Sequence, residues 1–315
     1  MKFLYLLEKI RNPFLDSLFS LITHIGEETV FLVLALVFFW CVSKREGYYI
    51  LITGLVGTVI NQAAKLAFKI PRPWVRDPSF TIVESARAEA TGYSFPSGHT
   101  QNVAGTFGAI GRYSSRTPIR ILSVAVIALV AFSRMYLGVH TPLDVCVSLG
   151  LAVLLVFCLY PIFTTEERFH RAVPYIMVLS VLLSLGLLLY VFLMSAEGVD
   201  PNNLASGMKN ASTLFGCTLA MIPVYILDTR YVRFETEAAW YAQIIKLVLG
   251  LGGVLAIKSG LSLPLVWLFG NEYVARGVRY FLIVMFAGAV WPLTFKFFSC
   301  LRIQALENLF AKKKK

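Results

Sequence analysis

Long runs of apolar residues, separated by short polar connections, set the pattern of this chain. The runs are continuous and do not alternate with a period of two, as half-buried strands do. A helix needs about 20 apolar residues to cross a bilayer, and fewer when it is buried among other helices. Nine runs are candidate spans: Thr29–Ser43, Tyr48–Phe68, Thr100–Tyr113, Ile119–Met135, Leu143–Phe163, Val173–Met194, Ser212–Leu227, Trp240–Ile257 and Tyr280–Phe298. Because a backbone in lipid must be helical or part of a closed barrel, the pattern predicts an all-α, polytopic transmembrane helix bundle.

The N-terminal segment, residues 1–25, has a different pattern. Charged residues recur at helical spacing among its apolar ones: Glu8, Lys9, Arg11 and Asp16. The segment has no small-residue cleavage site of the kind that ends a signal peptide. We therefore expect an amphipathic helix that lies at the membrane interface.

The composition agrees with a membrane protein. Of the 315 residues, 57% are hydrophobic and 15% are charged, whereas a soluble domain has about 25% charged residues. This deficit excludes a disordered or nucleic-acid-binding protein and argues against a soluble enzyme. The net charge is nevertheless +11, from 29 Lys and Arg against 18 Asp and Glu, so the positions of the positive charges need an explanation.

Positive charges gather in alternate connections between the runs. The positive-inside rule places these connections, and the C-terminus, in the cytoplasm. They carry Lys44, Arg45, Arg112, Arg116, Arg120, Arg168, Arg171, Arg230, Arg233, Arg302 and Lys312–Lys315. The early connections on the outer side also hold cations: Lys65, Lys69, Arg72, Arg76, Arg87 and Arg134. The rule does not explain these outer cations, and we interpret them as a site that binds an anion.

The first of three polar clusters on the outer side contains Lys65 and Arg72, which are seven residues apart. On one helix this spacing is about two turns, so both cations would share a face. The alternative is a pair of interfacial cations whose side chains snorkel to the membrane surface.

The second cluster, Pro96–His99, begins an apolar helix. The N-terminus of a helix has free N–H groups and a partial positive charge, which suit a phosphate. Gly98 lets a ligand come close to the backbone, and His99 is placed to give or take a proton. The alternative is that His99 is an interfacial histidine whose hydrogen bonds are satisfied.

The third cluster holds Arg134, His140 and Asp144. Thr141 and Asp144 have the spacing of a capping box at the start of a helix, which would make Asp144 a capping residue. The same geometry places the carboxylate one turn from His140. There it would hold one ring N–H and leave the other nitrogen free as a nucleophile. Both interpretations stay open.

Together the clusters place two histidines, several cations, a carboxylate and a phosphate-ready helix start on one membrane face. No carboxylate cluster able to hold a divalent cation is expected beside them, and the five cysteines have no metal-ligand spacing. We therefore predict phosphoryl transfer without a metal or another cofactor. In this chemistry cations bind the phosphate, one histidine attacks, and the other protonates the leaving oxygen.

Three motifs resemble the signature of the type 2 phosphatidic acid phosphatase superfamily, the lipid phosphate phosphatases. They are Lys-x6-Arg-Pro (Lys65 to Pro73), Pro-Ser-Gly-His (Pro96 to His99) and Ser-Arg-x5-His-x3-Asp (Ser133 to Asp144). Every motif position matches, and the resemblance covers residues 12–163. It implies a membrane core of six helices and metal-independent hydrolysis of a phosphomonoester or diphosphate.

The resemblance also implies a role for each residue. His140 would be the nucleophile that forms a phosphohistidine, and Asp144 would orient its ring. His99 would be the general acid and would later activate water. The phosphate would be bound by Lys65, Arg72, Ser97, Gly98 and Arg134.

The resemblance ends near the middle of the chain. We therefore divide the chain into a membrane phosphatase core, residues 1–165, and a C-terminal extension, residues 166–315, with about four further spans of unknown role. Within the extension, Lys246 and Lys258 lie in an apolar run, where a charge is a candidate functional residue. Snorkelling explains three further cations: Lys209, Arg276 and Arg279.

These features predict a phosphatase in a bacterial plasma membrane, with its site on the outer face. Its partners would be a lipid substrate and the bilayer, and no nucleic acid. Candidate substrates are undecaprenyl diphosphate, phosphatidate-like lipids, phosphatidylglycerol phosphate and sphingoid-base phosphates. Two alternatives stay open: a phosphatase of a soluble ester such as a sugar phosphate, and a lipid transporter or flippase built on the phosphatase core. An apolar opening between helices would favour a lipid, and a closed polar vestibule would favour a soluble ester.

Overall fold

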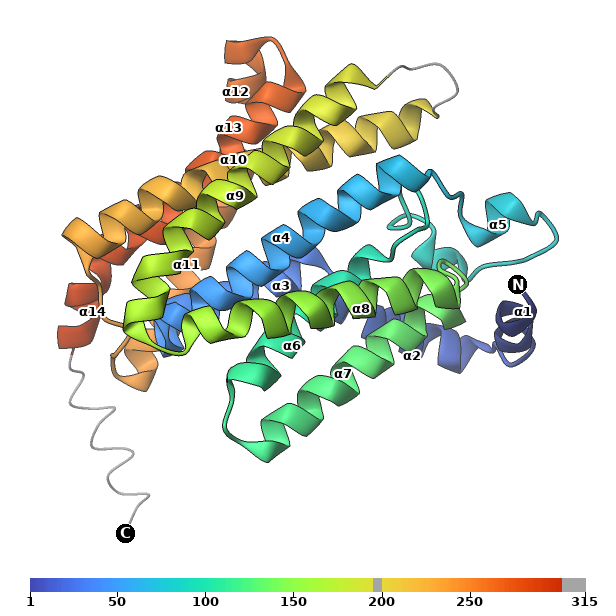
Figure 1. Ribbon diagram of the computed structural model, residues 1–315, viewed down its shortest axis with the longest axis horizontal. Coiled ribbons are helices and arrows are strands. Elements are labelled where there is room, and N and C mark those ends of the chain that lie inside the picture. The colour runs from blue at the N-terminus through green and yellow to red at the C-terminus, as the bar shows by residue number, and fades with distance from the viewer. Residues whose placement is uncertain (195–199, 302–315) are drawn as a thin grey trace.

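The computed structural model describes residues 1–194 and 200–301, and within them the chain is helical and has no strand. The predicted all-α class is confirmed. The helices are α1 (Lys2–Lys9), α2 (Pro13–Thr23), α3 (Glu28–Val37), α4 (Lys44–Phe68), α5 (Pro73–Arg76), α6 (Gly98–Tyr113), α7 (Thr117–Tyr136), α8 (Pro142–Leu159), α9 (Glu166–Leu193), α10 (Pro201–Leu227), α11 (Trp240–Gly260), α12 (Ser262–Phe269), α13 (Glu272–Met285) and α14 (Phe295–Cys300). Helix α4 lies between α6 and α8 on one side and α9 and α10 on the other (Figure 1).

Within the described residues, seven helical segments are long and apolar enough to cross a membrane. The bent pair Pro13–Gly26 and Glu28–Val42, with 51° between its halves, would make an eighth if it counts as one span. The nine predicted spans differ from these eight by one short helix, which also runs from one end of the bundle to the other (Figure 1). The predicted span Thr100–Tyr113 belongs to α6, which has only 16 residues. Helix α6 packs against α4, α7 and α8. The four spans predicted after residue 166 are all present.

The N-terminal segment forms two helices, so the prediction of one interfacial helix is wrong. Asn12 caps α2, because its Oδ1 accepts a hydrogen bond from the backbone N–H of Leu15 at 3.0 Å. Pro13 follows at the first helical position, where its missing N–H does no harm. This cap starts a new helix close to the end of α1. Helix α2 then continues through the bend toward α3.

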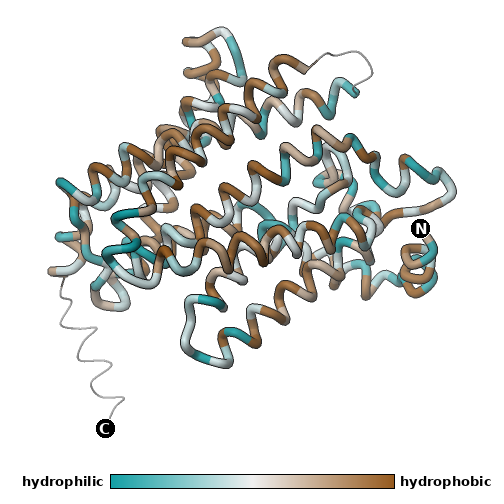
Figure 2. Tube along the Cα trace, viewed as in Figure 1, coloured by the Kyte–Doolittle hydropathy of each residue, from teal (hydrophilic) through white to brown (hydrophobic). Residues whose placement is uncertain are grey.

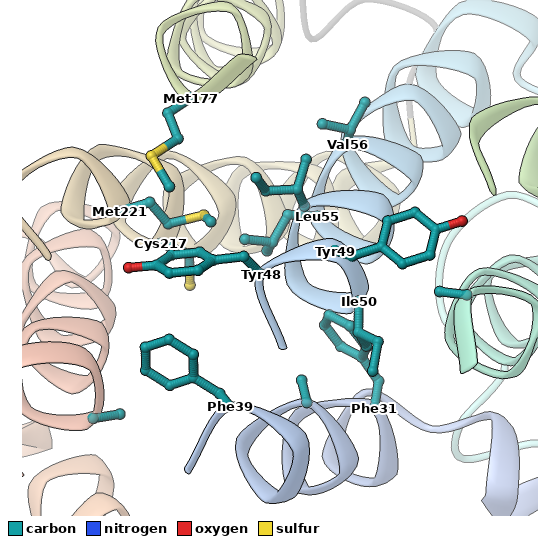
Figure 3. Packing of buried hydrophobic residues seen from close by; sticks show 14 of the residues in the cluster. Phe31, Phe39, Tyr48, Tyr49, Ile50, Leu55, Val56, Met177, Cys217 and Met221 are labelled. Atoms are coloured by element: carbon teal, nitrogen blue, oxygen red, sulfur yellow. The ribbon is translucent and has the colours of Figure 1, made fainter. Parts of the chain in front are cut away.

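One cluster of buried hydrophobic residues contains side chains from both the predicted phosphatase core, residues 1–165, and the extension. Helix α4 runs through its centre, and Figure 3 shows side chains of α4 packed between those of three other helices. The labelled side chains include Leu55 and Val56 of α4, Phe31 of α3, Met177 of α9, and Cys217 and Met221 of α10. In lipid, helices associate through such close packing rather than through exclusion of water.

Lys246 of the extension is buried and connects helices rather than lining a cavity of the site. Its side chain is 1% exposed, donates a hydrogen bond to the Trp40 carbonyl at 2.8 Å and lies over the Phe295 ring at 4.4 Å. The Trp40 indole N–H in turn donates to the Ala287 carbonyl at 2.8 Å. These contacts connect the segment Phe38–Val42, which follows α3, to α11, to the segment Phe286–Val290 after α13, and to α14. Lys258, the other candidate in this run, is exposed and lines no cavity of the site.

Polar residues collect at the two ends of the bundle, whereas the middle of the helices is apolar (Figure 2). One end holds the long connection from α4 to α6 and the turn from α7 to α8. The opposite end holds the connections from α6 to α7 and from α8 to α9, with their arginines. Arg302 and Lys312–Lys315, which the sequence analysis placed in the cytoplasm, lie outside the described residues. The helix order therefore brings the three sequence clusters to the same end.

Candidate active site

The three sequence clusters surround one cavity of about 390 Å³. They come from the end of α4, the connection after it, the start of α6, and both sides of the turn between α7 and α8. Six of the eight predicted site residues line the cavity: Lys65, Arg72, Gly98, His99, Arg134 and His140. The other two, Ser97 and Asp144, are buried and do not line it.

His140 is positioned by the turn between α7 and α8. Gly138 has a φ of 82°, a conformation that favours glycine, and a Cβ there would lie 2.7 Å from Nη2 of Arg11. The backbone N–H groups of Val139 and His140 both donate to the Arg134 carbonyl, at 3.2 and 3.3 Å. The turn therefore fixes the nucleophile candidate relative to a phosphate-binding candidate.

The ring of His140 has a defined protonation state. Nη1 of Arg72 lies 3.1 Å from Nε2 of His140. A guanidinium can only donate, so Nε2 accepts and we assign the ring proton to Nδ1. Burial, followed by the positive charges of Arg72 and Lys65, lowers the pKa of His140 well below its ordinary value. The ring is therefore neutral, with its lone pair on Nε2, as a nucleophile requires.

Asp144 lies behind His140 and fulfils the capping interpretation. Its Oδ2 accepts hydrogen bonds from the Thr141 N–H at 2.7 Å and the Ser94 hydroxyl at 2.6 Å, and Thr141 Oγ1 accepts from the Asp144 N–H at 3.3 Å. This is a complete capping box. The same Oδ2 lies 3.5 Å from Nδ1 of His140, which is longer than a good hydrogen bond. One carboxylate thus caps α8 and faces the protonated ring nitrogen.

Three buried cations face the cavity: Lys65, Arg72 and Arg134 are 8%, 6% and 1% exposed. Their hydrogen bonds go to neutral groups. Lys65 Nζ donates to the Tyr93 carbonyl at 2.7 Å, and Arg134 Nη1 donates to the Thr23 hydroxyl at 2.6 Å. In the part of the chain that the structure describes, none of the three forms an ion pair with a carboxylate. Glu27, Glu28 and Glu89 also line the cavity. A buried cation without an ion-pair partner is nevertheless unfavourable, so these three cations are suited to bind an anion.

The start of α6 contributes its backbone rather than the Ser97 side chain. Ser97 Oγ accepts hydrogen bonds from the N–H and the hydroxyl of Thr100, at 3.4 and 2.9 Å, so this side chain serves as the helix cap. A Cβ added at Gly98 would meet no atom within 4 Å. The backbone at Gly98 is therefore open toward the cavity that it lines, which suits the approach of a ligand.

His99 is held by residues that the sequence analysis did not single out. Its Nε2 lies 3.5 Å from Oε2 of Glu89. The contact with His99 lowers the pKa of Glu89, so this carboxyl is ionised near neutral pH. Gly26 packs against the other side, where an added Cβ would lie 3.0 Å from both the Cβ and the carbonyl oxygen of His99. An anion and a tightly packed glycine therefore position the imidazole.

Glu89 also belongs to a cluster that corrects the sequence analysis. Ligand atoms of His24, Glu27 and Glu89 lie within 4.8 Å of one another, a group that could hold a metal ion. His24 Nδ1 contacts Glu27 and lies 3.4 Å from Glu89. The expectation that no carboxylate cluster lies beside the site is therefore wrong. These residues come from two segments far apart in the sequence, so no spacing reveals them. The metal-free reaction stays a prediction.

The extension completes the wall of the cavity with Ser206 and Asn210 of α10. The apolar pattern did not include these residues in a helix, because the predicted span begins at Ser212, whereas the helix begins at Pro201. A polar first turn after a cap is the signal that marks the true start: Asp200 accepts hydrogen bonds from the first backbone N–H groups of α10.

A narrow cleft of about 50 Å³ adjoins the cavity and shares Glu28 and Asn210 with it. It lies along the seam where α3 and α4 meet α10 and α13. Most of its surface is apolar and comes from Phe31, Leu32, Leu55, Leu214, Cys217 and Tyr280, and Glu28, Thr58, Asn210, Thr213 and Arg276 also line it. The polar cavity therefore adjoins a seam between helices that is apolar over most of its surface.

Comparison with known proteins gives two family matches. The PAP2 superfamily matches residues 45–168, and the PAP2 superfamily phosphatase transmembrane extension matches residues 209–302. The chain is 29% identical over 203 residues to a probable sphingosine-1-phosphate phosphatase of Dictyostelium discoideum. The matched region covers 60% of this chain and 47% of that protein. The chain therefore spans about half the length of that relative. No solved structure matches the chain.

Two relatives from Bacillus subtilis are covered more completely. Undecaprenyl-diphosphatase BcrC is 32% identical over 151 residues, 47% of this chain and 75% of that protein. Phosphatidylglycerophosphatase B is 26% identical over 178 residues, 51% of this chain and 82% of that protein. The match to most of the BcrC chain, together with the two family matches, shows that this protein belongs to the PAP2 superfamily.

Proposed function

We propose that the protein is a membrane phosphatase that hydrolyses the phosphate or diphosphate group of a lipid, without a metal and through a phosphohistidine. One observation carries this proposal: three buried cations, which form no ion pair with a carboxylate of the described residues, line the same cavity as the neutral ring of His140, and Arg72 contacts that ring. A phosphate that satisfies these cations would lie beside the lone pair of Nε2. Its charged oxygens would be stabilised while the bond to phosphorus forms.

The proposed reaction has two steps. In the first, Nε2 of His140 bonds to phosphorus as the bond to the lipid oxygen breaks, and His99 gives its proton to that oxygen. In the second, His99 takes a proton from water, the water oxygen attacks phosphorus, and the bond to His140 breaks to release phosphate. Asp144 faces the positive charge that the phosphorylated ring carries at Nδ1. Gly98 leaves room for the phosphate, and Ser97 supports the start of α6.

The apolar seam supports a lipid substrate over a soluble ester. A lipid phosphate in the cavity would extend its chain between Leu32 and Leu55 on one side and Leu214 on the other. Known relatives of the chain are named for sphingosine-1-phosphate, undecaprenyl diphosphate and phosphatidylglycerol phosphate. Each of these has a phosphate at the end of an apolar chain, which agrees with a polar cavity joined to a seam.

We also propose that the site faces the outside of a bacterial plasma membrane and that the C-terminus is cytoplasmic. The support is the set of arginines at the opposite end of the bundle, in the connections after α6 and α8. Ser79 and Ser115 are exposed in connections at the two ends. A membrane-impermeant maleimide added to intact cells should label a Ser79→Cys variant above the background of the parent chain and should not label Ser115→Cys. The reverse labelling would contradict this orientation.

A labelled-phosphate experiment tests the chemistry. Purified protein in detergent should release phosphate from at least one lipid of a panel that includes polyprenyl diphosphate, phosphatidate, phosphatidylglycerol phosphate and sphingosine phosphate. Acid-labile, base-stable label should be trapped on the protein, and His140→Ala should abolish both the trapped label and at least about three powers of ten of the release. Transport of lipid between vesicle leaflets by His140→Ala, without phosphate release by the parent chain, would favour the transporter alternative.

A further inference from the structure

A second polar cavity, of about 620 Å³, lies beside the first and is not used by the proposed reaction. One wall is the connection between α4 and α6, and the other wall belongs to the extension. Five residues line both cavities: Arg72, Thr91, Gly92, Ser206 and Asn210. The two cavities are therefore neighbouring compartments, with Arg72 between them.

The second cavity carries positive charge. Arg72, Lys209 of α10 and Arg276 of α13 line it, and among the described residues one carboxylate, Asp200, lies in the same lining. Asp200 is already engaged as the N-cap of α10, where its Oδ1 accepts two backbone N–H groups at 2.7 and 3.2 Å. Three cations against one capping carboxylate leave an excess of positive charge. The lining is suited to a second anion rather than to an apolar chain.

Hydrogen bonds connect the two cations of the extension, Lys209 and Arg276, through Thr213. Nε of Arg276 donates to the Thr213 hydroxyl at 2.7 Å, and this hydroxyl donates to the Lys209 carbonyl at 2.8 Å. Lys209 Nζ lies 3.8 Å from Oε1 of Glu272, and both side chains are about half exposed. Such an exposed pair is weak, so an incoming phosphate can replace Glu272 as the partner of Lys209.

We propose that the second cavity binds a second phosphate of the substrate, so that the extension selects lipids with two phosphates over lipids with one. This proposal rests on the proposed function and names its substrate class. The phosphate to be cleaved occupies the first cavity, and the phosphate that remains on the lipid occupies the second. Arg72 contacts both, which couples recognition of the second phosphate to placement of the first.

A pair of substrates with the same chain isolates this contribution. Polyprenyl diphosphate and polyprenyl monophosphate have the same chain but differ in the bond that is cleaved, an anhydride in one and an ester in the other, so the change between parent and variant carries the test in this pair. Phosphatidylglycerol phosphate and phosphatidate form a second pair, in which the two phosphates are bridged and both cleaved bonds are esters. The readout is the ratio of kcat/KM for the lipid with two phosphates to that for the lipid with one. The first pair tests adjacent phosphates, and the second pair tests phosphates separated by a glycerol.

Lys209→Gln and Arg276→Gln remove one cation each, and Lys258→Gln is the matched control. Lys258 is an exposed cation of the extension that lines neither cavity. We expect Lys209→Gln and Arg276→Gln to lower the ratio by about tenfold to a hundredfold in at least one pair, since a hydrogen bond to a charged group is lost. Lys258→Gln should keep the parent ratio. Lys209 is half exposed, so its variant is the one that tests the proposal without a folding defect.

The proposal is overturned if the parent protein shows no preference for two phosphates in either pair, or if both variants keep the parent ratio. A binding measurement separates this proposal from the proposed function. Methylenediphosphonate should bind the parent protein more tightly than methylphosphonate, and Lys209→Gln should remove the difference. If no lipid releases phosphate, the proposed function fails, and the two phosphonates still decide whether the second cavity binds a second phosphate.

Discussion

The guanidinium of Arg72 covers the nitrogen of His140 that would attack phosphorus, with Nη1 3.1 Å from Nε2. Its other hydrogen bonds go to the carbonyls of Thr91, Gly92 and Val139, at 2.8, 3.2 and 3.0 Å. One side chain therefore joins the wall of the cavity to the turn that carries the nucleophile. A bound phosphate would take over the Nη1 group and release the lone pair of Nε2.

This contact predicts the protonation of His140. Burial and the nearby charges of Arg72 and Lys65 hold the pKa of His140 well below its ordinary value of about 6.5, so the ring should stay neutral as the pH falls through 6.5, with the proton on Nδ1. NMR of isotope-labelled histidine in detergent micelles measures both properties. The chain has four histidines, and His140→Ala identifies the signal. A titration midpoint at or above 6.5, or a proton on Nε2, would contradict the assignment.

The two roles of Asp144 can be separated. Asp144→Asn should lower kcat by about two to four powers of ten, because the ring proton of His140 loses the facing charge. Thr141→Ala removes the other half of the capping box and should lower the free energy of unfolding by about 1 kcal/mol, with kcat close to the parent value. Phosphate release and thermal unfolding check both. Equal losses of kcat in the two variants would mean that Asp144 acts only as a cap.

Glu89 is predicted to be a positioning residue for His99. Glu89→Gln removes the anion 3.5 Å from Nε2, which should lower kcat by about tenfold. The imidazolium then loses a stabilising neighbour, so the basic limb of the pH profile should move to lower pH. Glu84→Gln is the control, since Glu84 is exposed and pairs with Arg87. An unchanged pH profile in Glu89→Gln would show that Glu89 does not act on His99.

Metal removal tests the cofactor prediction. Protein dialysed against a chelator should release phosphate at the parent rate, because cations of the chain, rather than a metal, face the phosphate. The cluster of His24, Glu27 and Glu89 makes this test necessary. His24→Ala should likewise keep the insensitivity to chelator. Loss of activity that magnesium or zinc restores in the parent chain, and not in His24→Ala, would place a required metal at this cluster.

The cavity could be predicted largely from sequence because its residues occur in short local patterns at helix ends. His140, Arg134 and Asp144 lie within one turn region, and Lys65 and Arg72 lie on either side of one helix end. Alternate connections of a helix bundle meet at the same end, so the charge pattern was enough to bring these patterns together. No knowledge of side-chain packing was needed for this step.

The remaining features depend on tertiary packing and had no local signal. Glu89 meets His99 from a long connection, and Ser206 and Asn210 meet the cavity from the extension. The spans predicted from hydropathy are also shorter than the helices, because a polar first turn such as that of α10 lacks the apolar residues that mark a span. Ser97 matched its motif, yet its side chain is used by the helix itself. The division of the chain at residue 165 stays a prediction.

Helices α10 and α13 touch at Gly216 and Gly277, where a Cβ on Gly216 would lie 2.1 Å from the Gly277 carbonyl oxygen. Gly216 is seven residues from Lys209, and Gly277 follows Arg276 directly. The separation of the two cations is therefore set by backbone contact inside the membrane rather than by the loops at the surface. A single methyl group at this crossing would push the helices apart and would increase the distance between Lys209 and Arg276. A substitution at a buried glycine that contacts no substrate would therefore change the selectivity of the second cavity.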